Sequence, residues 1–156
     1  MLAPGTKAPD FSLNDAGGKI VSLKHLLKSG PLILYFYPAD FTPGCTKEAC
    51  AVRDLHEDIL AAGLRVVGVS PQSTASHARF RERHELPFTL LSDPDKSTIR
   101  LYDVDGPLGF GVRRGTYLID TKGVILSAVL ADLRIAEHDT FMRQAIAIIT
   151  KRSAAT

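Results

Sequence analysis

Short apolar runs alternate with segments of helical periodicity through the first half of the chain. Residues 32–37 and 64–70 are largely apolar, as is typical of strands buried on both faces of a sheet. Between them, residues 45–62 repeat apolar side chains every three or four positions, which predicts a helix. Its expected inward face consists of Ala49, Val52, Leu55, Ile59 and Leu60. Gly63 then stands where a left-handed C-terminal cap belongs.

The remaining elements are shorter and are marked by turn and cap residues. In order, the pattern predicts a hairpin over 11–21, a helix capped by Ser22 and ending near Lys28, a helix over 74–85 capped by Ser73, a strand over 88–91, a helical turn over 96–102, paired strands over 116–120 and 124–130, and a helix over 137–150. The last helix would direct inward Phe141, Ala145, Ile148 and Ile149, and residues 151–156 would fray. This order predicts an α/β fold, a three-layer α/β/α sandwich with a mixed central sheet and an N-terminal β-hairpin.

Length and composition fit a single compact domain spanning residues 1–156. The chain is 45% hydrophobic, and 19 basic against 17 acidic residues give a formal charge of +2. Because the two signs are interspersed, no nucleic-acid partner is expected. No apolar run approaches the roughly 20 residues that span a bilayer, and the N-terminus lacks a signal-peptide core, so we expect no membrane association and a cytoplasmic location. There, the two cysteines are expected to be catalytic rather than structural.

Cys45 lies at the junction of a predicted buried strand and a helix, after a loop over residues 39–44. Unpaired backbone N–H groups and the helix dipole favour an anion there, which predicts a Cys45 thiolate at neutral pH. Because the dipole contributes at most about 2 kcal/mol, a cation near the sulfur is also expected. Thr42 could donate its hydroxyl to the sulfur or to a bound oxygen. Packing would explain one buried cysteine, but not a Thr-Pro-Gly turn ending at Gly44 with Cys50 close behind.

The spacing of Cys45 and Cys50 limits what they can do together. Five residues of intact helix separate two Cα atoms by roughly 8.6 Å and place them on different faces, whereas a disulfide needs about 4.4–6.8 Å. The pair is therefore neither a permanent disulfide nor a redox Cys-x-x-Cys. It suits a cycle in which Cys45 is oxidised first and Cys50 resolves it once the helix start unwinds. No metal site is expected, because no cluster of histidines completes a ligand set.

The residues around Cys45 resemble a known active-site signature. The pattern Pro38-x-x-x-Thr42-x-x-Cys45 is similar to that of the peroxiredoxins, and residues 40–50 resemble the bacterioferritin-comigratory (Q-type) subfamily in particular. Further matches run through the chain at residues 8–13, 86–95 and 114–120. The resemblance implies a thioredoxin-like fold and a thiol peroxidase that reduces hydrogen peroxide and organic hydroperoxides, with no metal, haem or flavin.

The resemblance also implies a role for each residue of the signature. Cys45 would be the peroxidatic nucleophile and Cys50 the resolving thiol, so that a Cys45–Cys50 disulfide forms in each cycle. Pro38 would shield the pocket, and Thr42 would hydrogen-bond the peroxide. The predicted helix over residues 74–85 contains no cysteine, which leaves Cys50 as the intramolecular candidate.

The expected cation comes from a later strand. Arg113 and Arg114 are adjacent, so their side chains point to opposite faces and one of them can face Cys45. The resemblance selects Arg114 and leaves Arg113 solvated, while Glu48 occupies the position of an acid that orients the arginine. Two departures from the family are Tyr117, where phenylalanine is commoner, and a glycine-rich loop over residues 103–112 near the site.

Partners and rival functions follow from the same cycle. Thioredoxin or a similar dithiol would reduce the disulfide, and the resemblance implies a monomer more often than a dimer. One rival is a thioredoxin-like disulfide oxidoreductase, although the Cys-x-x-Cys spacing is absent. Another is a non-catalytic redox sensor or holdase, which would be oxidised once rather than turn over. Most of the five histidines are expected at the surface or partly buried.

Overall fold

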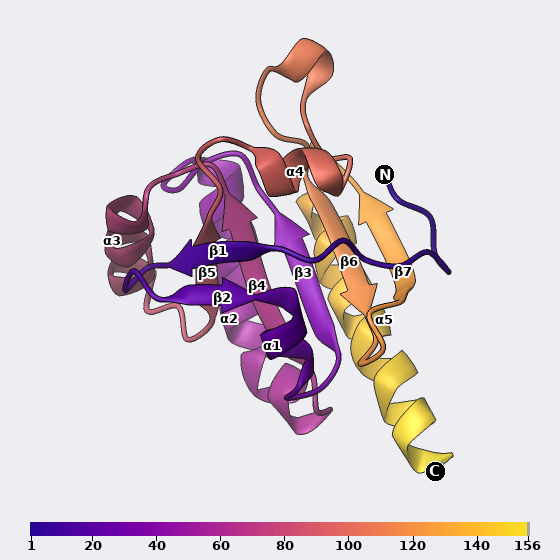
Figure 1. The fold of residues 1–156 in the computed structure, drawn as a ribbon. Coiled ribbons are helices and arrows are strands. Elements are labelled where there is room, and N and C mark those ends of the chain that lie inside the picture. The colour runs from indigo at the N-terminus through magenta and orange to yellow at the C-terminus, as the bar shows by residue number, and fades with distance from the viewer. Residues whose placement is uncertain (156) are drawn as a thin grey trace.

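The computed structural model describes residues 1–155 and contains a seven-stranded mixed sheet (Figure 1). The strands are β1 (Ser12–Asp15), β2 (Ile20–Ser22), β3 (Leu32–Phe36), β4 (Arg65–Ser70), β5 (Thr89–Ser92), β6 (Gly115–Ile119) and β7 (Ile125–Leu130). Their order across the sheet is β2-β1-β5-β4-β3-β6-β7. The three central strands β3, β4 and β5 are parallel, and the outer pairings are antiparallel. Every residue of β3 is buried, as its unbroken apolar run predicts.

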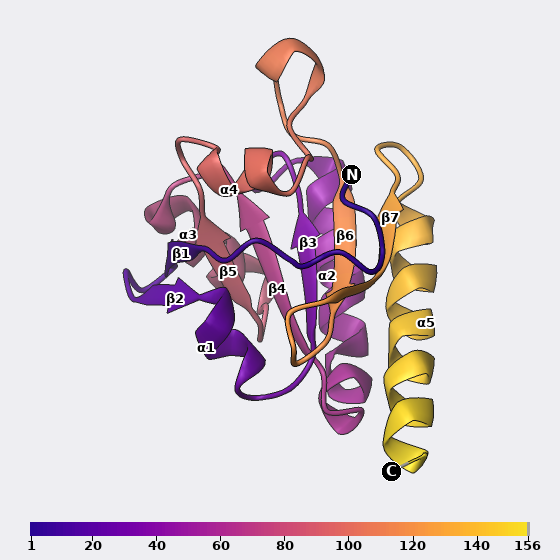
Figure 2. The same cartoon turned by 45° about the vertical axis from the view of Figure 1, so that its right-hand side comes forward.

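Helices cover both faces of this sheet, which confirms the three-layer α/β/α sandwich (Figures 1 and 2). They are α1 (Leu23–Leu27), α2 (Pro43–Ala61), α3 (Thr74–His84), α4 (Ser97–Leu101) and α5 (Ile135–Ala154). One apolar core lies between the sheet and α2, α3 and α5, and a second lies between the opposite face and α1, α4 and the N-terminal segment. No helix within residues 1–155 has the length and apolar character to cross a bilayer.

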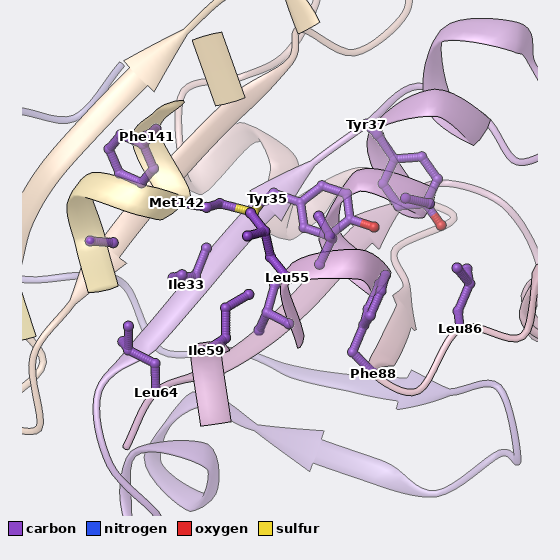
Figure 3. Packing of buried hydrophobic residues seen from close by; sticks show 14 of the residues in the cluster. Ile33, Tyr35, Tyr37, Leu55, Ile59, Leu64, Leu86, Phe88, Phe141 and Met142 are labelled. Carbon is purple, nitrogen blue, oxygen red and sulfur yellow. The ribbon is translucent and has the colours of Figure 1, made fainter. Parts of the chain in front are cut away.

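Packing in the first core explains a glycine in a central strand. Tyr35 and Tyr37 project from the β3 side of the sheet with their rings stacked 5.5 Å apart (Figure 3). A Cβ added to Gly68 on β4 would lie 2.7 Å from Tyr35 Cζ. Glycine therefore lets the Tyr35 ring cross β4 without a clash.

The predicted caps are confirmed, whereas the start of α2 and the inward faces of α2 and α5 differ from the prediction. Ser22 and Ser73 each accept a backbone hydrogen bond at a helix start, and Gly63 has a φ of 81°. Helix α2 begins at Pro43, so part of the expected loop belongs to its first turn, where proline's fixed φ is favourable. The prediction that Leu60 and Ile148 face inward is wrong, because each adjoins another apolar position and the helix buries one of the two.

Helix α5 is longer than predicted at both ends. It begins at Ile135 and continues to Ala154, into the segment 151–156 that was expected to fray. Lys151 and Arg152 lie in its last turn, where positive charge is favourable at the negative end of the helix dipole. The last residue of the expected frayed segment, Thr156, lies outside the described residues.

Candidate active site

Cys45 lies in the first turn of α2, after the buried strand β3 and the loop that follows it, as the sequence predicts. Its side chain is buried, with 1% of its surface exposed. Thr42 is the N-cap, but its side chain makes no cap hydrogen bond and instead donates to the Ala39 carbonyl at 3.2 Å. Pro43 carries no N–H, so the backbone N–H groups of Gly44 and Cys45 are the ones in this turn that can bind an anion.

Arg114 is the cation at the Cys45 sulfur. It immediately precedes β6 and is 8% exposed. Its Nη2 donates to Cys45 Sγ at 3.0 Å, and its Nη1 donates to Glu48 Oε1 at 3.4 Å. The structure therefore joins three predicted site residues in one buried chain of contacts. A guanidinium at this distance stabilises negative charge on the sulfur.

Gly44 allows that approach. A Cβ at Gly44 would lie 2.9 Å from Arg114 Nη2 and 3.1 Å from the Ile135 side chain. Any larger residue would have to displace the guanidinium or the start of α5. The Thr-Pro-Gly turn thus leaves space for the arginine as well as turning the chain.

Glu48 extends the site toward α5. Burial raises the pKa of Glu48 to about 7, although the Arg114 guanidinium opposes this change. Its Oε2 lies 3.6 Å from Nδ1 of His138, which is 1% exposed and also contacts Thr116 Oγ1 at 2.8 Å. We call Cys45, Glu48, Arg114, Thr116 and His138 the cysteine cluster.

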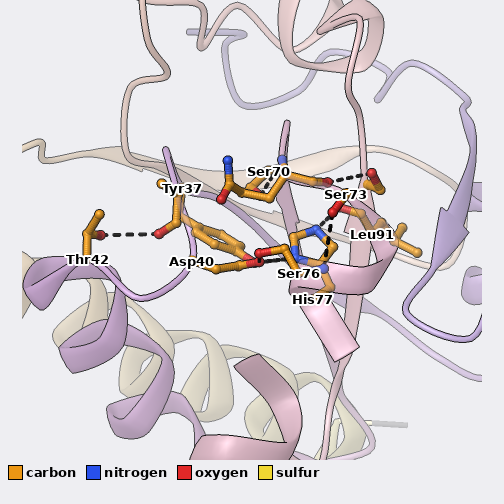
Figure 4. Close-up of polar contacts among 11 residues, drawn as sticks. Tyr37, Asp40, Thr42, Ser70, Ser73, Ser76, His77 and Leu91 are labelled. Carbon is orange, nitrogen blue, oxygen red and sulfur yellow. Dashed lines mark hydrogen bonds and ion pairs between the residues drawn. The ribbon is translucent and has the colours of Figure 1, made fainter. Parts of the chain in front are cut away.

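A second buried group of polar side chains holds the loop between β3 and α2 (Figure 4). Asp40 accepts hydrogen bonds from Tyr37 and Ser76, each at 2.7 Å, and its Oδ2 lies 2.8 Å from His77 Nδ1. The other ring nitrogen of His77 contacts the Leu91 carbonyl at 3.1 Å. Burial raises the pKa of Asp40, but its bonds to His77, Tyr37 and Ser76 outweigh this and hold it below the ordinary value. We call Tyr37, Asp40, Ser76 and His77 the loop cluster.

Sequence reasoning missed both buried histidines. His77 and His138 are 0% and 1% exposed, whereas most histidines were expected nearer the surface. Three of the five do follow the expectation. No local pattern marks the two buried ones, because their partners come from distant segments. Asp40 could have been found, since it lies within the motif that carries the family resemblance.

Cys50 and Arg113 lie apart from these contacts. Cys50 is half-buried on α2, both cysteines are free thiols, and the helix between them is continuous. Arg113 is half-exposed and pairs with Asp132 at 2.9 Å, so it is solvated as expected but also salt-bridged.

A pocket of about 430 Å³ reaches Arg114 from the surface. Its wall includes Pro38 and, from the glycine-rich loop, Pro107 and Phe110. This loop extends away from the sandwich (Figures 1 and 2), and Leu108 and Phe110 are 95% and 78% exposed. The pocket thus combines apolar loop residues with the Arg114 side chain and the Arg113–Asp132 ion pair.

The chain also matches a known family. Residues 4–128 fit the model of the AhpC/TSA family. The chain therefore belongs to the AhpC/TSA family. A putative peroxiredoxin bcp of Coxiella burnetii is 44% identical over 86% of this chain and 91% of that protein, so the chain belongs, within the family, to the peroxiredoxins of the Q, or bacterioferritin comigratory, type.

Relatives and solved structures specify this assignment. Peroxiredoxin Q of Arabidopsis thaliana, named as chloroplastic, is 50% identical over 123 residues, which are 78% of this chain and 56% of the plant protein. The chain thus spans little more than half the length of the plant relatives it matches. Peroxidoxin BcpB of Mycobacterium tuberculosis superposes with a TM-score of 0.87 at 34% identity, covering 96% of this chain and 97% of that one. A structure of Xanthomonas campestris bacterioferritin comigratory protein, described for alkyl peroxide reduction, gives 0.82 at 29% identity, covering 89% and 92%. The sandwich is the thioredoxin fold of these enzymes.

Proposed function

We propose that this chain is a thiol peroxidase that reduces hydrogen peroxide and organic hydroperoxides through Cys45. The observation that carries the proposal is the 3.0 Å contact of Arg114 Nη2 with Cys45 Sγ inside a buried site. A structural cysteine does not require a buried guanidinium, because a neutral thiol is stable in an apolar core. Membership of the AhpC/TSA family supports the same chemistry.

In the first step, the Cys45 thiolate attacks one oxygen of the peroxide. The S–O bond forms as the O–O bond breaks, so sulfur is oxidised to a sulfenic acid and the peroxide is reduced to water or an alcohol. Negative charge moves onto the departing oxygen, which takes up a proton. Arg114 and the N–H groups of the first turn of α2 stabilise that charge. Thr42 would turn its hydroxyl from Ala39 to the peroxide, and Pro38 would limit water access.

In the second step, Cys50 resolves the sulfenic acid. Its thiol attacks the Cys45 sulfur, a disulfide forms and water leaves. The first turns of α2 must unwind, because the intact helix holds the two residues too far apart. An external dithiol, for which we propose thioredoxin, then reduces the disulfide and restores both thiols.

The glycine-rich loop supports organic hydroperoxides as substrates. Pro107 and Phe110 of this loop offer apolar surface in the pocket that reaches Arg114. Replacing Phe110 with serine should raise KM for cumene hydroperoxide more than for hydrogen peroxide. Leu101→Ser, at an exposed position on α4, is the matched control. Equal changes for both peroxides would argue against this pocket as the substrate entrance.

The cysteine variants test the function itself. Cys45→Ser should abolish peroxide consumption, and measurable turnover in that variant would refute the proposal. Cys50→Ser should reduce one equivalent of peroxide and then stall or over-oxidise with thioredoxin as donor. Mass mapping of wild-type protein should find a Cys45–Cys50 bond after one turnover. Repeated turnover of peroxide with thioredoxin as reductant would exclude a sensor that is oxidised only once. Faster reduction of insulin than of peroxide would instead favour a disulfide oxidoreductase.

Two further expectations stay predictions. One is a cytoplasmic location, although the plant relatives are named as chloroplastic. The other is a monomeric state.

A further inference from the structure

His138 is a buried histidine whose contacts connect α5 to the site. Its Nε2 lies 3.0 Å from the Ala131 carbonyl, and its Nδ1 lies 2.8 Å from Thr116 Oγ1 and 3.6 Å from Glu48 Oε2. These partners come from the end of β7, from β6 and from α2. The ring thus lies beside Glu48 Oε2, whereas Arg114 contacts Oε1 of the same carboxyl group.

The contacts determine which ring nitrogen carries hydrogen. A carbonyl oxygen only accepts, so Nε2 must donate to Ala131 in either charge state. Burial is the main cause that lowers the pKa of His138, which favours the neutral ring. Its Nδ1 therefore presents a lone pair, to which the Thr116 hydroxyl donates.

Glu48 has one oxygen that needs a partner. Oε1 accepts from Arg114, whereas Oε2 is buried and has no hydrogen-bond partner among residues 1–155. An unpaired buried carboxylate oxygen is costly, and a protonated one could donate. A movement of about 0.6 Å would bring Oε2 within hydrogen-bond distance of His138 Nδ1.

The titratable groups around Glu48 come from four elements. Arg114 precedes β6, Cys45 lies on α2 itself, Tyr35 projects from β3, and His138 lies on α5. Burial raises the pKa of Tyr35 well above its usual value, and negative charge on Glu48 and Cys45 raises it further. His138 Nδ1 is thus the group facing Oε2 that can accept a hydrogen bond from protonated Glu48, provided that the Thr116 hydroxyl turns away from the Nδ1 lone pair.

We propose that His138 is a positioning residue for Cys45: its Nδ1, which takes a hydrogen bond from the carboxyl proton of Glu48 in exchange for the one from the rotatable Thr116 hydroxyl, keeps the Glu48–Arg114–Cys45 chain of contacts in place. With that proton on Glu48, the Arg114 charge is directed at the sulfur. Once Glu48 ionises, its carboxylate faces a lone pair and competes with the sulfur for the guanidinium. The inference rests on the proposed function only in taking Cys45 as the reactive thiolate.

The test measures the sulfur directly. In a Cys50→Ser parent, the ultraviolet absorbance of the Cys45 thiolate is followed against pH, alone and with His138→Phe or Thr116→Val. His138→Phe should move the midpoint by about half a pH unit or more and slow the reaction with hydrogen peroxide about tenfold. Thr116→Val preserves shape and leaves the Nδ1 lone pair to Glu48 alone, so it should move the midpoint in the opposite direction. His56→Phe, on the Cys45 helix and packed against Phe88, should change neither value.

A double-mutant cycle identifies the route. In a Glu48→Met background, His138→Phe should have no further effect on the midpoint, because the side chain at position 48 then has no hydrogen to donate to Nδ1. An equal shift with and without Glu48 would overturn the proposal, as would unchanged midpoints in both His138→Phe and Thr116→Val. A parent that failed to consume peroxide would contradict the proposed function instead, while the thiolate titration would still report on His138.

Discussion

The two buried polar clusters beside the start of α2 differ in how completely their atoms are hydrogen-bonded. In the loop cluster, Asp40 has three side-chain partners and His77 uses both ring nitrogens. In the cysteine cluster, Arg114 donates one hydrogen bond to the Cys45 sulfur and one to the Glu48 carboxyl group. The other oxygen of that group, Oε2, has no hydrogen-bond partner among residues 1–155. A satisfied network fixes one geometry, whereas an unsatisfied one keeps charge available for chemistry. We infer from this difference that the loop cluster holds the loop before Cys45 in place, and we propose that the cysteine cluster activates the thiol.

The largest expected effect is on the stability contributed by the loop cluster. Asp40→Ala leaves His77 buried without its carboxylate, which should lower the free energy of unfolding by about 3–5 kcal/mol. Urea denaturation at neutral pH measures it. Asp54→Ala, which removes an exposed partner of Arg53, should cost less than about 1 kcal/mol. Similar losses for both would show that Asp40 is not a structural anchor.

The pH dependence of that loss has a definite sign. The pKa of folded Asp40 is held below its ordinary value of 3.8. Its contribution is therefore present above that value and disappears as the pH falls through the folded pKa. The difference between wild type and Asp40→Ala should shrink on acidification.

The next effect is on the chemistry of the cysteine cluster. Arg114→Met removes the donor at Cys45 Sγ and should slow peroxide reduction by about 10²–10³-fold, the usual loss for one donor at a developing charge. Stopped-flow oxidation of the reduced protein measures it. Arg113→Met is the matched control, because its side chain pairs with Asp132 at the surface. If both variants react alike, Arg114 is not the activating cation.

Glu48 should show the opposite pH behaviour to Asp40. Raising its pKa from 4.5 to about 7 means that the folded protein binds more protons than the unfolded chain, so stability falls as the pH rises through this window. Over this window the free energy of unfolding should fall by about 3 kcal/mol. Glu48→Gln cannot ionise and should lack this decline, so its stability relative to wild type rises between pH 4.5 and 7. Parallel stability curves for the two proteins would contradict the buried-carboxyl account.

The smallest expected effect is at Gly44, where the reaction rate and the stability should respond differently to substitution. Gly44→Ala should slow the Cys45 reaction about tenfold by displacing the Arg114 guanidinium. Alanine also favours a helix over glycine by about 1 kcal/mol, so the loss of rate should not come with a comparable loss of stability. Thermal unfolding and stopped-flow rates are compared with Gly17→Ala, in the turn between β1 and β2. An unchanged rate would show that the Arg114 approach does not need Gly44.

Local patterns were sufficient for most of the fold. Apolar runs and cap residues located the strands and helices, because a buried strand and an amphipathic helix each leave a periodic signature in neighbouring residues. They failed at Leu60 and Ile148, where two adjacent apolar residues compete for one buried face. They also failed at the end of α5, which extends beyond the predicted limit.

For the site, the sequence by itself determined that Cys45 lies in the first turn of a helix, which follows from the apolar periodicity after it. It also determined that Cys50 cannot reach Cys45 while the helix is intact, which follows from the spacing of the two residues. Family resemblance pointed to Arg114, but only the tertiary structure brings its guanidinium to a sulfur 69 residues away. His77 and His138 became buried partners in the same way, through strand order and helix packing. Side chains from separate elements meet where the sheet and helices direct them, and no local pattern encodes that meeting.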